Sequence, residues 1–336
     1  MNNIRLTESI VELTHACPMA CKHCYVKKNK PDLSLEEWLY IFSKLKEIGI
    51  RDIVLMGGES TVYPYFTQII SYCLNTFKNV TVETSATTKT EFYRFPSCNV
   101  CVSFEYPEKE RNDNIRIFKN GKKSHFETAI RKIKTLHNPK ILRFTLYQDS
   151  NVFKSLVMAD MYGCNSIFFP LIPLGSGKGM IRNCPDAKKI AETLRTIEEF
   201  NKKSRFHHEL ALPQTYLYNK ELYLKFAKTF KERSRVCQAG FRRIYIDVSG
   251  NVMPCPFIPI KLGNLLKNDI NFIYSKIHEF NEKMEKKMPG FPCSECFYYK
   301  LCGAGCHAYH YNKKTKQQEN CPVNFLIKNY KEVIRK

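Results

Sequence analysis

The sequence predicts an α/β fold, a partial (β/α)6 TIM-like barrel followed by a small cysteine-rich domain. Strand and helix patterns alternate over the first two thirds of the 336 residues, the periodicity weakens after about residue 205, and cysteines gather from Cys237 onward. Such alternation is typical of a parallel sheet with helices outside it. About six strand–helix units fit before residue 205, so an open barrel fits the length better than a closed barrel of eight units.

The expected strands are short apolar runs, and the expected helices have apolar residues at helical spacing. Strands are expected at 10–13, 53–56, 80–83, 100–104, 142–147 and 167–169. Helices are expected at 35–48, 66–77, 124–136, 152–162 and 187–203. Ser34 is the expected N-cap of the first helix, Glu37 completes a capping box, and Gly49 is its expected stop.

The composition predicts how the chain divides. Residues 1–205 are expected to form the barrel, and residues 206–236 to link it to the last domain. Residues 237–336 are expected to form that last domain, and residues 237–321 are rich in Cys, Pro, Gly and aromatic residues and have few long apolar runs. Such a segment needs metal to hold its shape. A final helix is expected at 323–334.

Composition and charge exclude several classes of protein. With 43% hydrophobic and 25% charged residues, the chain is not disordered. It lacks a signal peptide and a membrane-spanning run, so we expect a cytoplasmic protein whose 15 cysteines bind metal rather than form disulfides. The net charge of +21 comes without a nucleic-acid motif. It indicates a solvated lysine-rich surface, an acidic protein or peptide partner, or, less expected without such a motif, a nucleic-acid surface, and no membrane partner is expected.

Three cysteines follow the first expected strand. Cys17, Cys21 and Cys24 are separated by three and two residues. Three thiolates on one short loop can hold three corners of a four-iron cluster and leave the last iron open to substrate. A zinc site completed by His15 or His23 is the alternative. Chemistry in parallel α/β folds sits at the carboxyl ends of the strands, where this loop is expected.

This loop, with the segments after it, resembles the radical S-adenosylmethionine (SAM) superfamily over roughly residues 8–200. Gly57, Gly58 and Glu59, after the second strand, resemble its Gly-Gly-Glu-Pro motif, with Ser60 in the place of proline. The resemblance implies that the glycines let backbone carbonyls approach the SAM ammonium. Glu59 either assists that contact or braces the loop.

The resemblance extends to the segment after the fourth strand. Ser103 and Glu105 stand where the superfamily has a serine and an acidic residue that reach towards SAM, with Glu105 replacing the usual aspartate. Arg116 lies one residue late for an arginine that pairs with the SAM carboxylate, and a surface role is the alternative. The implied chemistry is reductive cleavage of SAM to a 5′-deoxyadenosyl radical, which abstracts a substrate hydrogen. No general base is identifiable, so the catalytic residues are unknown.

Seven cysteines in the last third match, gap for gap, the SPASM domain, an auxiliary-cluster module of radical SAM maturases. Structural zinc is the alternative. The resemblance implies that one auxiliary cluster is held by Cys293, Cys296, Cys302 and Cys321. It implies that the other is held by Cys237, Cys255 and Cys306. The chain would then hold three four-iron clusters. This last set is one thiolate short, and Cys184, a non-thiolate side chain, water or substrate could complete it.

Proteins that resemble this architecture mostly modify peptides and proteins by crosslinking, epimerisation or oxidation. The first hypothesis is therefore a maturase of a ribosomally made peptide, with flavodoxin or ferredoxin as the reductant. The alternatives are an enzyme of tetrapyrroles or other small molecules, and a non-enzymatic iron–sulfur protein that binds nucleic acid. Only 16 residues precede Cys17, so we expect recognition of a leader peptide to rest on a separate protein or on the barrel mouth.

Overall fold

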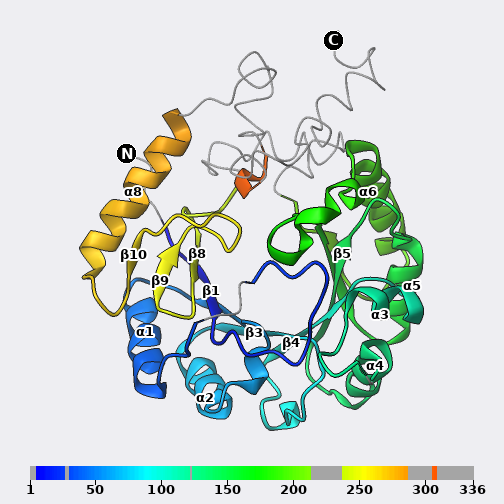
Figure 1. Ribbon diagram of the computed structural model, residues 1–336, viewed down its shortest axis with the longest axis horizontal. Coiled ribbons are helices and arrows are strands. Elements are labelled where there is room, and N and C mark those ends of the chain that lie inside the picture. Colours follow the sequence, from blue (N-terminus) through cyan, green and yellow to red (C-terminus); the bar gives the residue numbers. More distant parts are fainter. Residues whose placement is uncertain (1–4, 27–29, 122, 213–236, 287–304, 309–336) are drawn as a thin grey trace.

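The computed structural model describes residues 5–26, 30–121, 123–212, 237–286 and 305–308 (Figure 1). Within these residues, one ten-stranded sheet has the order β10-β9-β8-β1-β2-β3-β4-β5-β6-β7. From β8 to β7 every neighbouring pair is parallel, and the pairs of β8 with β9 and of β9 with β10 are antiparallel. The predicted parallel α/β sheet is confirmed.

The strands are β1 (Glu8–Glu12), β2 (Asp52–Met56), β3 (Asn79–Thr84), β4 (Asn99–Phe104), β5 (Lys140–Leu146), β6 (Asn165–Pro170), β7 (His208–Leu210), β8 (Arg243–Ile246), β9 (Asn251–Met253) and β10 (Gly263–Asn264). The α-helices are α1 (Leu35–Glu47), α2 (Phe66–Thr76), α3 (Lys109–Ile115), α4 (His125–Thr135), α5 (Val152–Met161), α6 (Ala187–Asn201) and α8 (Ile270–Lys286). Short 3-10 segments are η1 (Ser60–Val62), η2 (Phe92–Arg94) and η3 (Gly175–Asn183).

Helix α1 begins and ends where its sequence predicts. The Ser34 hydroxyl accepts a hydrogen bond from the Glu37 amide at 3.2 Å, and the Glu37 carboxylate accepts one from the Ser34 amide at 2.8 Å. This reciprocal pair satisfies two amides that the helix leaves unpaired. Gly49, after the C-cap residue Ile48, has φ +89°, a conformation that glycine adopts at little cost.

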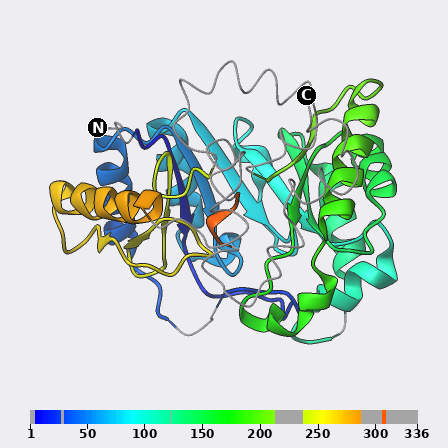
Figure 2. The ribbon, with the colours of Figure 1, turned by 90° about the horizontal axis from the view of Figure 1, so that it is seen from above.

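The helices lie outside the curved sheet (Figure 1). Figure 2 shows the sheet between the orange α8 at one side and the green helices at the other. Along β3, Val80 and Val82 pack in the main hydrophobic core. The alternate residue Glu83 lines a cavity on the opposite face. Because side chains alternate along a strand, the polar positions of the central strands face the barrel interior.

The sheet continues beyond residue 205. Strand β7 pairs with β6, and β8 pairs in parallel with β1, with Glu8 opposite Arg243. The predicted division at 205 and 237 stays a prediction, and the sheet runs across it. Neither α3 nor α8 was expected, and the predicted helix at 323–334 lies outside the described residues. In the part of the chain that the structure describes, no helix has the length and apolarity to cross a bilayer.

Candidate active site

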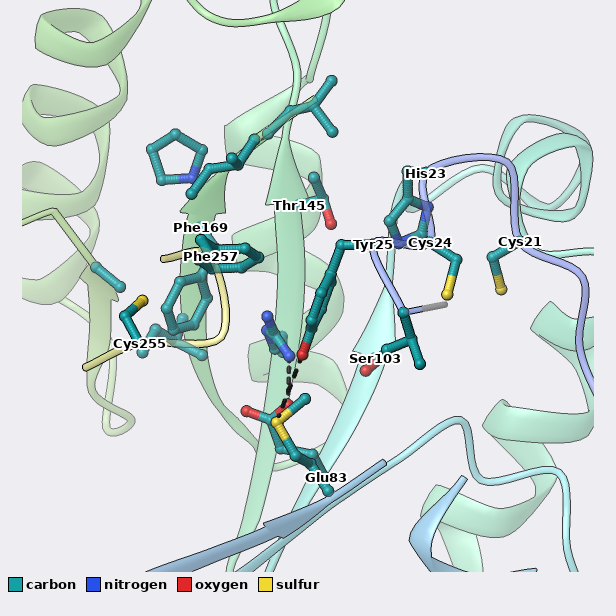
Figure 3. Close-up of a pocket in the computed structure, with 18 of the residues that line it drawn as sticks. Cys21, His23, Cys24, Tyr25, Glu83, Ser103, Thr145, Phe169, Cys255 and Phe257 are labelled. Atoms are coloured by element: carbon teal, nitrogen blue, oxygen red, sulfur yellow. Dashed lines mark hydrogen bonds and ion pairs between the residues drawn. The ribbon is translucent and has the colours of Figure 1, made fainter. Parts of the chain in front are cut away.

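A cavity of about 590 Å³ inside the barrel brings cysteines of both sets together (Figure 3). The loop after β1 contributes Cys17, Cys21 and Cys24 to its lining. The second set contributes Cys237, Cys255 and Cys306. Of the predicted SAM-contacting residues, the lining includes Gly57, Gly58, Glu59, Ser103 and Arg116. Residues from distant parts of the chain thus meet at the carboxyl ends of parallel strands.

The glycine pair after β2 lies against the backbone of the cysteine loop. A Cβ atom on Gly57 would lie 2.5 Å from the Thr14 carbonyl oxygen. One on Gly58 would lie 2.5 Å from the Ala16 carbonyl oxygen. The Gly58 amide donates to the Thr14 carbonyl at 2.7 Å. Both glycines are therefore required for the cysteine loop to pack on this turn, whatever they contact in the cavity.

The segment after β6 supports the last cysteine of the loop. Gly175 has φ +55°, and a Cβ atom there would lie 2.5 Å from the Cys24 carbonyl oxygen. The next amide, of Ser176, donates to that same carbonyl at 2.8 Å. The cysteine loop is therefore held between the turn after β2 and the turn after β6.

Glu59 is buried and hydrogen bonded to the chain itself. Its Oε1 accepts hydrogen bonds from the hydroxyls of Thr61 and Thr84 at 2.6 and 2.7 Å. Its Oε2 accepts them from the amide and the hydroxyl of Ser85 at 2.7 and 2.5 Å. These hydrogen bonds join the ends of β2 and β3, which is the loop-bracing role considered for Glu59. A contact between Glu59 and SAM stays a prediction.

Arg116 is held in the barrel by Glu105. The guanidinium Nε and Nη2 both lie 2.8 Å from Oε1 of Glu105, and the Tyr147 hydroxyl donates to Oε2 at 2.8 Å. The Arg116 side chain is only 11% exposed, which excludes a surface role. Burial alone would raise the pKa of Glu105, but His23, the Arg116 guanidinium and hydrogen bonds from Thr145 and Tyr147 hold it below its usual value. The pair is therefore charged at neutral pH.

The two histidines considered as zinc ligands contact carboxylates instead. Nε2 of His15 lies 3.3 Å from Glu12, and Nε2 of His23 lies 3.4 Å from Glu105. Burial lowers the pKa of His23 to about 4, so its ring is neutral at pH 7. Neither Nε2 atom is therefore directed at the three cysteines.

An ion pair that the sequence did not reveal lies deeper in the cavity. Arg143 on β5 pairs with Glu83 on β3, and its guanidinium lies 4.6 Å from the ring centroid of Phe169. Figure 3 shows Tyr25, the residue after Cys24, pointing towards Glu83. The sequence offered one signal for this pair. Glu83 and Arg143 are each the one charged residue within the apolar run of their strand, at a position that faces the cavity. Strand β4 lies between β3 and β5, so the pairing required the sheet order.

The second set of cysteines faces the first across two aromatic rings. Cys255 follows β9, and the ring of Phe257 packs edge-on against Tyr25 with centroids 4.9 Å apart. Cys184, a candidate for the missing ligand, packs instead with Tyr106, Tyr147 and Leu171 and does not line the cavity. Cys293, Cys296, Cys302 and Cys321 lie outside the described residues.

Burial keeps the Cys21 and Cys255 thiols protonated, and a bound metal would favour their thiolate form. Burial is the largest cause that raises the pKa of Cys21 to about 11, and Glu105, Cys17 and Cys24 add to it. Burial and Cys237 likewise raise the pKa of Cys255 to about 12. Neighbouring buried thiolates repel one another, and cationic iron offsets that repulsion. Among the described residues, no three His, Cys, Asp or Glu side chains are spaced for one metal ion. A four-iron cluster spans more space than one ion.

Two protein-family models match separate parts of the chain. The family model for the radical SAM superfamily matches residues 11–146, and that of an iron–sulfur cluster-binding domain, SPASM, matches residues 237–297. An AdoMet-dependent heme synthase of Nitratidesulfovibrio vulgaris is 22% identical, over 90% of this chain and 87% of the relative. The sporulation killing factor maturation protein SkfB of Bacillus subtilis is 24% identical, over 82% of this chain and 67% of SkfB.

The fold itself has close structural neighbours. Streptococcus suis SuiB, in a crystal structure bound to its precursor peptide SuiA, superimposes with a TM-score of 0.74 at 15% identity. The match covers 92% of this chain and 74% of SuiB. It confirms the predicted fold class, and the two family models imply iron–sulfur clusters and SAM binding.

Proposed function

We propose that this chain, which is a radical SAM enzyme with a C-terminal SPASM domain, modifies a peptide or protein substrate. The observation that carries the proposal is the single cavity lined by both sets of cysteines. A substrate side chain held there would lie between a radical source on one wall and a second redox group on the other. SkfB, named as a maturation protein, and SuiB, seen with its precursor peptide, support a peptide as the substrate.

We assign the first cluster to Cys17, Cys21 and Cys24, with SAM bound beside it. Cys237, Cys255 and Cys306 would hold one auxiliary cluster, and Cys293, Cys296, Cys302 and Cys321 the other. Bound there, the reduced cluster and SAM would supply a 5′-deoxyadenosyl radical. The chain's own part is to fix the cysteine loop through Gly57 and Gly58 and to keep water out of the barrel.

The charges around the cavity support a proposal for how SAM is oriented. Arg116 lines the cavity and forms the ion pair with Glu105, so we infer that its guanidinium binds the SAM carboxylate. Glu105 is absent from the cavity lining and acts as a positioning residue for Arg116. Ser103 also lines the cavity and is the hydroxyl proposed to contact SAM.

Replacing Glu105 with glutamine is expected to weaken SAM binding by about 10- to 100-fold, since loss of an outer partner of a ligand typically costs that much. It leaves Arg116 buried without its counter-charge, which should lower the free energy of unfolding by about 3–5 kcal/mol. Calorimetric titration of SAM into reconstituted enzyme and thermal denaturation measure the two effects. Tyr147→Phe is the matched control, because it removes one hydrogen bond and keeps the ion pair. Equal SAM affinity in wild type and Glu105→Gln would contradict the positioning role.

The proposed function is tested with reconstituted enzyme, dithionite as the reductant and synthetic peptides encoded beside its gene. We expect stoichiometric 5′-deoxyadenosine and a peptide of altered mass by mass spectrometry. An iron-containing or iron-free tetrapyrrole is assayed in parallel, because the heme synthase of N. vulgaris is a relative of comparable identity. Conversion of the tetrapyrrole with every peptide unchanged would replace our proposal by that second function. Absence of 5′-deoxyadenosine would reject both.

A further inference from the structure

A second cavity, of about 810 Å³, adjoins the cysteine loop, and exposed lysines line it. Its lining includes Cys21 and Cys24, which also line the barrel cavity. The same short loop therefore contributes to the walls of both cavities. A molecule bound in the second cavity would contact the segment that carries two of the three proposed cluster ligands.

The second cavity has an apolar floor and a basic rim. Met19, Val26 and Met180 contribute apolar surface to it. Lys22, Lys119 and Lys178, which we call the lysine rim, are exposed side chains from three separate segments. Within the residues that the structure describes, none of these three lysines forms an ion pair with a carboxylate. The Lys22 ammonium instead donates a hydrogen bond to the side-chain amide oxygen of Asn114 at 2.7 Å. The rim therefore presents positive charge that the described chain does not neutralise.

The segments that carry the lysine rim are tied to the cysteine loop by backbone hydrogen bonds. The Lys22 amide donates to the Ile115 carbonyl at 3.0 Å, and the Lys119 amide donates to the Pro18 carbonyl at 2.9 Å. The bond from Ser176 to the Cys24 carbonyl fixes the segment of Lys178 in the same way. The positions of the three lysines relative to the cluster loop are thus set by the fold and not only by side-chain contacts.

We propose that the lysine rim docks an acidic one-electron donor protein, one that carries a low-potential flavin or iron–sulfur centre. The donor loses one electron, and the cluster held by Cys17, Cys21 and Cys24 gains it, with no bond made or broken. Interfaces of this kind are small and short-lived, and complementary charge governs how fast they form. A donor at the rim would approach the loop from the second cavity and leave the barrel cavity free for SAM and substrate. The inference rests on the proposed function and names its electron donor.

The test is the triple variant Lys22→Glu, Lys119→Glu, Lys178→Glu with reduced flavodoxin as the probe. Reversing three lysines changes the charge of the rim by six units, so we expect flavodoxin affinity and flavodoxin-driven SAM cleavage to fall at least about 10-fold at low salt. In the wild type both should weaken as salt is added. Binding by biolayer interferometry and 5′-deoxyadenosine by chromatography are the readouts. With dithionite, a small reductant that needs no docking surface, cleavage should stay within twofold of wild type.

Lys203→Glu, Lys261→Glu, Lys267→Glu is the matched control, because it changes the net charge equally at three exposed lysines outside the second cavity. An equal loss of flavodoxin binding in both triple variants would overturn the proposal, as would loss of dithionite-driven cleavage in the rim variant. Loss of pyrophosphate binding with flavodoxin binding intact would identify an anion site instead. Failure of dithionite-driven enzyme to modify any peptide would reject the proposed function and leave this inference standing.

Discussion

Replacing Cys255 with alanine is expected to abolish formation of the modified peptide while SAM cleavage continues. Cys255 lines the barrel cavity with Cys237 and Cys306, apart from the loop of Cys17, Cys21 and Cys24. Loss of an outer partner of a ligand typically costs 10- to 100-fold, so loss of a ligand itself should cost more than about 100-fold in product. The first set of cysteines is untouched, so 5′-deoxyadenosine should form within about 10-fold of the wild-type rate.

The measurement combines iron analysis, 5′-deoxyadenosine and peptide mass on the same reconstituted sample. Iron should fall by about four atoms per chain, as for one lost cluster. Cys73→Ala is the control, because Cys73 lies on the buried face of α2 and does not line the cavity. It should lower thermal stability and keep both activities. Wild-type iron content in Cys255→Ala would show that Cys255 is not a ligand, and loss of SAM cleavage would show that the two sets do not act separately.

The elements that the sequence predicted well have a strong local signal. The first helix was expected at 35–48 and runs over Leu35–Glu47, because Ser34, Glu37 and Gly49 mark its ends whatever the rest of the chain does. The cysteine loop was likewise visible from spacing alone. Ligands to one cluster must lie on one short segment or on segments that meet, and the first set lies on one.

The elements that the sequence missed depend on partners far along the chain. Strand β8 has only four residues, Arg243–Ile246, and it is stabilised by pairing with β1, more than 200 positions earlier. The sequence of α3, Lys109–Ile115, is almost entirely polar, so no apolar period predicts it. Local patterns carry no information about such pairings, which are decided by tertiary packing.

The same limit applies within the site. The motif Gly57-Gly58-Glu59 predicted a turn that approaches a ligand, whereas the structure shows that the turn first approaches the cysteine loop. Likewise Glu105 was expected to reach towards SAM, and its carboxylate is occupied by Arg116 and Tyr147. Resemblance supplied candidate residues for the site, and only the fold shows which of them line the cavity and which hold a neighbour in place.

Replacing Gly58 with alanine is expected to disrupt the cysteine loop. The added Cβ would lie 2.5 Å from the Ala16 carbonyl oxygen and 2.6 Å from that of His15. Both atoms belong to backbone, so no side-chain rotation relieves the overlap, and the segment leading to Cys17 must move. Misplacing a reacting group by about 1 Å costs about 100-fold, and we expect at least that loss in SAM cleavage. Overpacking should also lower the free energy of unfolding by about 1–3 kcal/mol.

Gly179→Ala is the matched control, because no atom lies within 4 Å of its added Cβ and its φ is not in the left-handed region. It should keep wild-type cleavage and stability. The dithionite-driven rate of 5′-deoxyadenosine formation and the iron bound per chain separate two ways in which Gly58→Ala could act. Reduced iron would mean that the loop no longer holds its cluster, and full iron with slow cleavage would mean that SAM is misplaced beside an intact cluster. Wild-type rates in Gly58→Ala would contradict the argument that the cysteine loop can pack here only against a glycine, because the added Cβ would overlap two backbone carbonyl oxygens.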